Sequence, residues 1–159
     1  MNIDYISGFF DADGSITMCK NKKDAKFKTI KIDFTNTELN ILISIQNFLK
    51  NNYNIKLHIS SKRTVKINHN QSFCLSTTSN QECIKLCKLL KSIHPKKLHR
   101  INTILKYHNL VTKRNGKYNN KQISRKLAYE RLFFSSLFQV RSDYIIIPTN
   151  REQDAKSGY

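Results

Sequence analysis

The 159-residue sequence has few acidic residues, only four glycines and two prolines, and no tryptophan. Eleven Asp and Glu residues stand against 28 Lys and Arg, so the formal net charge is +17. This basic excess favours a polyanionic partner, because binding releases counterions condensed on nucleic acid. An anionic membrane surface would also suit the charge, but no segment approaches the roughly 18–20 apolar residues of a spanning helix. The first residues, MNIDYISGFFDADG, do not have the pattern of a signal peptide.

The four cysteines do not have the spacing of a disulfide framework or a zinc site. Cys83 and Cys87 lie four residues apart, Cys19 and Cys74 fall in expected strands, and no C-x-x-C pair is present. We expect free thiols and a reducing, intracellular compartment. The chain also contains 17 Asn, 21 Lys and 19 Ile, which A/T-rich codons encode. This composition favours an A/T-rich source, and we expect an organelle, either a mitochondrion or a chloroplast.

Apolar and polar residues alternate in four segments, which predicts four strands with one buried face. Residues 15–19 and 27–36 alternate on either side of a polar turn and predict a hairpin. Residues 55–60 and 72–76 alternate on either side of a basic loop and predict a second pair. Together the four segments predict an antiparallel sheet with a polar outer face.

Helices are expected between and after these strands. Thr35 with Glu38, and Ser79 with Glu82, have capping-box spacing and predict two helix starts, the second helix running through Ile93. A further helix is expected at 96–111 and a last one at 123–139. The order α-ββ-α-ββ-α with additional C-terminal helices predicts an α+β fold. We expect one domain over residues 1–150 and a frayed tail over 151–159.

The polar sheet face carries side chains suited to a DNA major groove, where base edges present donors and acceptors. These residues are Thr17, Cys19, Thr29, Lys31, Asp33, Lys56, His58, Lys66, Asn68, Ser72 and Ser76. An ordinary half-buried sheet also has a polar outer face, so alternation alone leaves both interpretations open. Basic loop residues suit phosphate contacts instead; they are Arg63, Lys113, Arg114, Lys117 and Lys121.

The first segment differs from the others, because it runs from a helix directly into a strand. Gly8 and Ala12 lie four residues apart and share one helical face. A helical glycine costs about 0.5–1 kcal/mol relative to alanine, which close packing against another helix would recover. Gly14 is expected to end the helix with a positive φ. Asp11 and Asp13 lie near the negative helix end, which suggests Mg²⁺, although a D-x-D-G turn also occurs in proteins without metals.

Residues 6–14, ISGFFDADG, resemble the LAGLIDADG motif of the homing endonucleases. Gly8, Asp11, Ala12, Asp13 and Gly14 match the motif directly. The expected element order is also similar to the αββαββα order of that family over roughly residues 3–111. The chain carries one such motif. The resemblance therefore implies a homodimer that packs through Gly8 and Ala12, places two copies of Asp13 beneath the DNA, and reads a roughly palindromic target.

The resemblance also implies roles for individual residues. Asp13 would bind a divalent cation, Mg²⁺ or another such as Mn²⁺, with the backbone carbonyl of Ala12 as a further ligand. Asn36 occupies the position of a polar residue that orders water near the nucleophile; it also suits the start of the following helix. Lys97 would stabilise charge in the pocket, with Lys96 as the neighbouring candidate.

The implied function is a site-specific DNA endonuclease that makes a staggered double-strand break by metal-dependent hydrolysis. The main alternative is a non-cleaving nucleic-acid-binding protein on the same scaffold, such as an intron RNA maturase or a transcription factor. A structural RNA-binding protein of a ribonucleoprotein would explain the charge. It would leave the helical glycine and the adjacent aspartates unexplained.

Overall fold

The structure, a computed structural model, describes residues 1–20, 23, 25–61, 71–112 and 117–135. The chain divides into two compact units, Met1–Leu98 and His99–Tyr159. Each unit is described by itself below. The expected single domain over residues 1–150 stays a prediction, and the expected tail over 151–159 lies outside the described residues.

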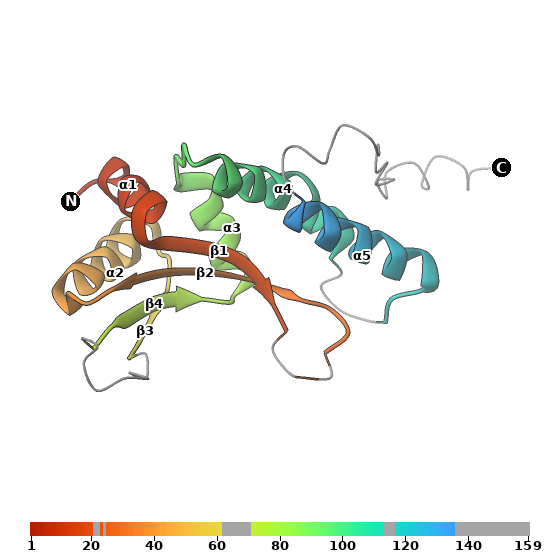
Figure 1. Ribbon diagram of the computed structural model, residues 1–159, viewed down its shortest axis with the longest axis horizontal. Helices are drawn as coiled ribbons and strands as arrows, with labels where there is room; N and C mark the ends of the chain where they lie inside the picture. Colours follow the sequence, from red (N-terminus) through yellow and green to blue (C-terminus); the bar gives the residue numbers. More distant parts are fainter. Residues whose placement is uncertain (21–22, 24, 62–70, 113–116, 136–159) are drawn as a thin grey trace. The chain divides into compact units, whose positions relative to one another are not determined.

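The first unit has the element order that the alternation patterns predicted. It contains α1 (Ile3–Asp13), β1 (Gly14–Cys19), β2 (Thr29–Asn36), α2 (Leu39–Tyr53), β3 (His58–Ser61), β4 (Phe73–Thr77) and α3 (Asn80–Leu89), followed by the start of α4 (Pro95–Val111). The strands form one antiparallel sheet in the order β1-β2-β4-β3 (Figure 1). The α+β prediction is therefore confirmed.

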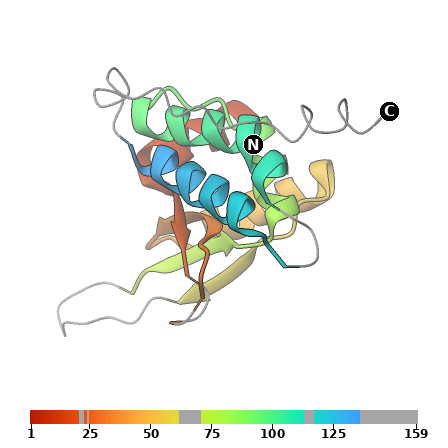
Figure 2. The ribbon, with the colours of Figure 1, turned by 90° about the vertical axis from the view of Figure 1, so that its right-hand side faces the viewer.

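Three helices cover one face of this sheet. Figures 1 and 2 show α1, α2 and α3 on the same side of the strands. Ile30, Ile32 and Phe34 of β2 are fully buried, whereas the residues between them are half-buried. The period of two thus separates an apolar core face from a polar outer face.

Both expected capping boxes are wrong, although the helices begin close to where they were predicted. Glu38 is itself the N-cap of α2 and makes no side-chain cap bond. Ser79 is the N-cap of α3 as expected, but it also lacks a side-chain cap bond. Glu82 instead accepts a hydrogen bond from the backbone N–H of Lys56 at 2.9 Å. A tertiary partner therefore replaces the local one.

The reason for glycine at position 14 also differs from the prediction. Gly14 ends α1 with φ −89° and ψ 162°, which is extended backbone and not the left-handed region. A Cβ atom here would lie 2.6 Å from the carbonyl oxygen of Phe10 and 2.8 Å from its Cα. Glycine is required by the close approach of the helix to the strand.

The third helix is shorter than expected. It ends at Leu89, and Leu90 is the extended C-cap. Residues 90–94, called the α3–α4 loop below, connect it to α4 without helical structure. Ile93 is 86% exposed. The helix therefore ends one turn before Ile93.

The second unit contains the remainder of α4 and α5 (Asn120–Phe134), which lie side by side (Figures 1 and 2). The His99 ring near the start of α4 contacts the carbonyl oxygen of Leu132 near the end of α5 at 2.9 Å, and Nζ of Lys126 donates to the Thr112 hydroxyl just after α4 at 2.6 Å, so the two helices are antiparallel. The last helix begins three residues earlier than predicted, because Asn119 and Gln122 form a capping box. Residues 136–139 of the predicted helix lie outside the described residues.

The structure shows the state of the cysteines and the character of the helices. All four cysteines are free thiols, as expected. Within the described part of the chain, no helix is long and apolar enough to cross a membrane.

Candidate functional site at the end of α1

The last turn of α1 brings Asp13 against the end of β2. Asp13 is exposed and is the final residue of the helix, and β1 follows it directly. The pairing of Gly14 with Phe34 places Asn36 two residues beyond this junction. The Asn36 Nδ2 atom donates to Oδ2 of Asp13 at 3.1 Å. Its Oδ1 atom accepts from the N–H of Glu38 at 2.8 Å, so Asn36 also supports the start of α2.

Lys97 reaches the same helix end from the first turn of α4. Its Nζ atom donates to the carbonyl oxygens of Phe10 at 2.6 Å and Asp11 at 2.9 Å. Burial lowers the pKa of Lys97 and outweighs the opposing effect of the nearby Asp11 and Asp13 carboxylates. The ammonium group therefore lies where the helix dipole and two carboxylates concentrate negative charge. The structure thus brings Asp13, Asn36 and Lys97 to one place.

Asp11 has a different environment from Asp13, although only one residue separates them. Its carboxylate accepts hydrogen bonds from the Ser92 hydroxyl, from the N–H of Ile93 at 2.7 Å and from the N–H of His94 at 3.4 Å. Burial raises the pKa of Asp11, but these hydrogen bonds outweigh it and the pKa is lowered. Asp11 is thus held as an anion by the protein itself, and its hydrogen bonds give it a structural role.

Sequence reasoning missed the role of the α3–α4 loop, which follows α1 along its length. The N–H of Lys91 donates to the Ser7 hydroxyl at 3.0 Å, and its Nζ pairs with Asp4 at 2.8 Å. Asp11 then binds the N–H groups before α4, while Lys97 binds the carbonyls at the end of α1. Each helix therefore caps the other. No local sequence pattern predicts contacts between residues more than 80 positions apart.

The residues at this site suit a hard divalent cation. Asp13 offers an exposed carboxylate, and Ala12 beside it is also exposed. Among the residues that the structure describes, no group of three or more His, Cys, Asp or Glu side chains could hold a metal. Mg²⁺ is typically bound by one or two carboxylates, with water and substrate phosphate as its other ligands. The donor set therefore fits an ion that shares its coordination with substrate.

One face of α1 is open beside the site. Gly8 and Ala12 are exposed, and Tyr5 on the same helix is 49% exposed. A Cβ atom added at Gly8 would meet nothing within 4 Å. No contact within the described residues explains this helical glycine.

The outer sheet face aligns its polar residues in rows across the strands. One row contains Ser15, Asp33, Ser76 and His58, so it crosses the whole sheet. Thr17 pairs with Lys31 in the next row, and Cys19 pairs with Thr29 beyond it. These predicted residues share one face, as the alternation indicated.

Lys31 and Asp33 form an ion pair at 3.1 Å on this face. Burial lowers the pKa of Lys31, but Asp33 outweighs burial and the pKa is raised. A cation and an anion are therefore held close together on the outer sheet face.

The other predicted contact residues have varied positions. Lys56 is exposed and precedes β3, Ser72 precedes β4, and Lys117 and Lys121 are exposed in the second unit. Arg63, Lys66, Asn68, Lys113 and Arg114 lie outside the described residues.

The family model of the LAGLIDADG endonucleases matches residues 6–97, more than half of the chain. The chain belongs to this family. The matched range runs from the start of the motif in α1 to Lys97, and so includes every residue described at the helix end. No curated protein matches the chain.

Solved structures share the fold of this LAGLIDADG protein. I-AabMI bound to uncleaved DNA is 18% identical to this chain with a TM-score of 0.57. The match covers 81% of this chain and 43% of the I-AabMI chain. I-SmaMI, bound to an uncleaved DNA target with calcium ions, is 20% identical to this chain with a TM-score of 0.58. The match covers 85% of this chain and 44% of the I-SmaMI chain. The group I intron-encoded homing endonuclease I-CeuI, complexed with DNA, is 15% identical to this chain with a TM-score of 0.57. The match covers 86% of this chain and 68% of the I-CeuI chain. The chain thus spans less than half the length of the first two.

Proposed function

We propose that this LAGLIDADG chain is a site-specific homing endonuclease that makes a staggered double-strand break in DNA at an intron-insertion site. The observation that carries the proposal is the meeting of Asp13, Asn36 and Lys97 at the end of α1. The Asp13 carboxylate is exposed and forms no salt bridge with the described residues of the first unit. An exposed, oriented carboxylate beside an amide and an ammonium suits phosphodiester chemistry.

Each residue has a definable task in this proposal. Asp13 and the carbonyl of Ala12 would hold Mg²⁺ or Mn²⁺, which when bound polarises phosphate oxygens and makes water a better nucleophile. Asn36 fixes one carboxylate oxygen of Asp13 through its 3.1 Å hydrogen bond. Lys97 reduces the negative charge of the helix end, and its ammonium is positioned for charge that develops on the phosphate.

The polar sheet face is the proposed DNA-reading surface. Its rows place hydrogen-bonding side chains on adjacent antiparallel strands, which suits readout of base edges in the major groove. The net charge of +17 supplies the sequence-independent attraction. Base contacts from the sheet would then provide specificity, and phosphate contacts from basic loops would provide affinity.

The open face of α1 supports a homodimer, which would give the two active sites needed for two strands and a roughly palindromic target. Gly8→Ala tests this arrangement. A methyl group meets open space in the single chain, so helix stability should rise by about 0.5–1 kcal/mol, while the dimer seen by sedimentation should weaken. Asn47→Ala, at an exposed position of α2, is the control. An unchanged dimer would place the interface elsewhere.

Cleavage is tested by incubating the chain with a DNA library of intron-insertion sites and Mg²⁺. The proposal expects staggered double-strand cuts in a defined subset of sequences, and none with Asp13→Asn. Retention of intron RNA without any DNA cutting would support the maturase alternative and overturn the endonuclease.

A further inference from the structure

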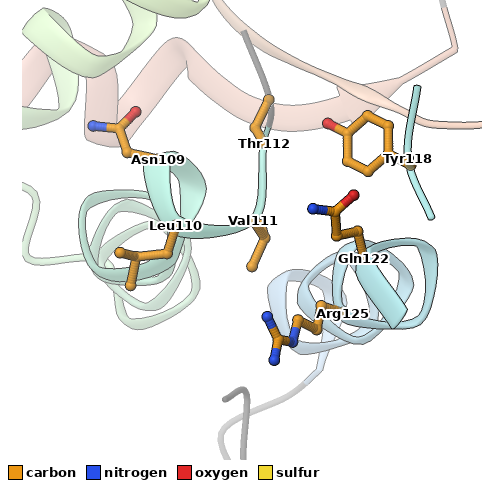
Figure 3. Close-up of a pocket in the computed structure, with 7 residues that line it drawn as sticks. All are labelled: Asn109, Leu110, Val111, Thr112, Tyr118, Gln122 and Arg125. Carbon is orange, nitrogen blue, oxygen red and sulfur yellow. The ribbon is translucent and has the colours of Figure 1, made fainter. Parts of the chain in front are cut away.

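Charged and polar side chains lie close together in two places away from the end of α1. One is a cavity of about 50 Å³ in the second unit, between the end of α4 and the first turn of α5 (Figure 3). There the Thr112 hydroxyl accepts a hydrogen bond from Lys126 at 2.6 Å, and Gln122 accepts one from the N-cap of α5 at 3.0 Å, so these groups support the packing of the helices. The other place is the ion pair of Lys31 and Asp33 on the outer sheet face.

The Lys31–Asp33 pair is built into an inner strand. β2 lies between β1 and β4, and its residues 31 and 33 share one face because they are two positions apart. Asp33 lies opposite Ser15 of β1 and Ser76 of β4. Nζ of Lys31 is 3.1 Å from Oδ2 of Asp33, and the side chains of Lys31 and Asp33 are 33% and 13% exposed. The sheet therefore surrounds the carboxylate, while the ammonium is more open to solvent.

The Lys31 side chain brings its ammonium to the position of Asp33 along the strand. Successive residues of a strand rise by about 3.3 Å, so residues 31 and 33 are roughly 6.6 Å apart. Successive bases along one strand of DNA are about 3.4 Å apart. Two independent side chains at the strand spacing would address bases about two steps apart. The 3.1 Å contact instead brings the donor and the acceptor within the thickness of one base pair.

A donor and an acceptor at this separation match the major-groove edge of a single base pair. O6 of guanine accepts a hydrogen bond from N4 of cytosine, so these two atoms lie about 2.9 Å apart. In the groove, guanine presents O6 and N7 as acceptors and cytosine presents N4 as a donor. A lysine ammonium only donates, and an ionised carboxylate only accepts. Each charged group of the pair therefore has a complementary atom on a G·C base pair.

The balance of charge in the pair suits base reading better than phosphate binding. Burial lowers the pKa of Lys31, but the hydrogen bond and the charge of Asp33 outweigh burial and the pKa is raised, so the ammonium stays charged at neutral pH. A pair without net charge adds little sequence-independent attraction to DNA. A partly exposed ion pair also adds little to the stability of the fold. Hydrogen bonding to a defined base pair makes use of both charges.

We propose that Lys31 and Asp33 act together to read one G·C base pair in each DNA half-site, with Lys31 donating to O6 and N7 of guanine and Asp33 accepting from N4 of cytosine. C·G and A·T base pairs place an amino group against the ammonium and a carbonyl against the carboxylate. T·A has the right order of groups, but thymine offers one acceptor beside its methyl group. The expected preference is therefore G·C, then T·A, then the other two. This assignment rests on the DNA target proposed above.

Selection of duplexes from a random library by the full chain tests the assignment. The wild type should prefer G·C at one position of each half-site. Lys31→Met and Asp33→Asn should both relax this same position, by about tenfold to a hundredfold. Lys50→Met removes an exposed cation from α2, on the other side of the sheet, and should leave every base preference unchanged. Relaxation at two different positions, or at none, overturns the proposal.

Affinity for random-sequence DNA separates base reading from a structural role of Asp33. Asp33→Asn removes a negative charge, so random-sequence duplexes should bind more tightly even though the preference for G·C falls. A carboxylate that only shaped the sheet would, on removal, weaken binding to all sequences equally. Equal weakening over all duplexes would therefore show that Asp33 is structural and overturn its part in reading.

Exchange of the two side chains tests the pairing itself. The double variant Lys31→Asp with Asp33→Lys keeps both charges on the same sheet face but reverses the order of donor and acceptor. Its preference should change from G·C to C·G at the same position, and it also serves if one of the single variants does not fold. A double variant that still prefers G·C would assign this preference to other residues and overturn the proposal.

The base-reading proposal and the endonuclease proposal fail separately, because base preference is measured by binding and not by cutting. If the wild type cuts DNA while Lys31→Met and Asp33→Asn keep the G·C preference, the reading pair is wrong and the endonuclease stands. If the preference follows the pair but the wild type never cuts with Mg²⁺, the reading pair stands and the endonuclease is wrong. A wild type with no base preference in duplex DNA overturns the reading pair, whether or not it cuts.

Discussion

The end of α1 and the buried face of α5 differ in electrostatic character. At the end of α1, two carboxylates and the carbonyls of Phe10 and Asp11 lie close to a single lysine ammonium, Lys97. On α5, the consecutive cations Arg125 and Lys126 are buried, and Glu130 is buried as well. The chain as a whole is strongly basic, so its net charge describes neither place. The local arrangement of side chains decides the charge of each, and at the end of α1 it suits a cation.

Asp13→Asn should have the largest effect on this contrast. The substitution removes the exposed carboxylate that would hold the divalent ion, so cleavage should fall about a thousandfold or more. DNA affinity should change little, because the proposed binding surface is the sheet. Cleavage assays and filter binding on the same preparation measure the two quantities. Cutting by the variant at a normal rate with Mg²⁺ would show that the metal is bound elsewhere.

Acid should destabilise the second unit through His108. This residue is 3% exposed, and burial, with a smaller contribution from Lys126, lowers its pKa from 6.5 to about 4. Because the folded pKa is depressed, the unfolded chain binds more protons, and stability is lost as the pH falls from 6.5 toward 4. The loss approaches about 3 kcal/mol at the lower end.

Thermal unfolding at pH 7 and pH 4.5 measures this effect. His108 faces Tyr129, whose hydroxyl lies 3.1 Å from Nδ1, and the Lys126 ammonium, which is already positive. His108→Phe should be less stable at pH 7 but nearly independent of pH over this range. An equally steep acid dependence in His108→Phe would assign it to other groups.

Asp11→Asn should destabilise the chain, whereas Asp13→Asn should leave its stability nearly unchanged. The Asp11 carboxylate accepts from Ser92, Ile93 and His94, and an amide would turn a donor toward one of these donors. A loss of about 1–3 kcal/mol is expected, against less than about 0.5 kcal/mol for the exposed Asp13. Denaturant unfolding compares the two variants. Equal stabilities would mean that the α3–α4 loop does not depend on this carboxylate.

Lys31→Ala should have the narrowest effect, because it concerns specificity at single positions of the target. If Lys31 reads a base edge, its removal should relax preference at one position in each half-site by about 1–3 kcal/mol. Asp33, which now pairs with it at 3.1 Å, would be released. Binding to a set of single-base variants measures the preference. A uniform loss over all sequences would instead identify Lys31 as a phosphate contact.

The strands and the meeting of the site residues could be predicted because their signals are regular. Alternation along β2 follows directly from the pleat of the strand, and Ile30, Ile32 and Phe34 are buried as it predicted. The family motif located Asp13, and the position after the second strand located Asn36. In each case the informative residues lie within one element or in a known order of elements.

The remaining features depend on contacts between distant segments. Glu82 has capping-box spacing from Ser79, yet it binds the N–H of Lys56, 26 residues away. Gly14 is required by Phe10 packing against it and not by its own backbone angles. The α3–α4 loop reads as the end of a helix, because Ile93 continues the apolar spacing although the backbone has left the helix. A local sequence pattern does not show which distant residue will replace the local interaction.

The mutual capping of α1 and α4 also has a consequence for the order of assembly. Asp13 is synthesised well before α4, and the hydrogen bonds from Lys91 and Lys97 to α1 span 84 and 87 residues. Contacts of such separation form late, since the intervening chain must be ordered first. A ribosome-bound chain that ends before α4 therefore carries the aspartate without the frame that orients it. The site is therefore oriented only after α4 has been synthesised.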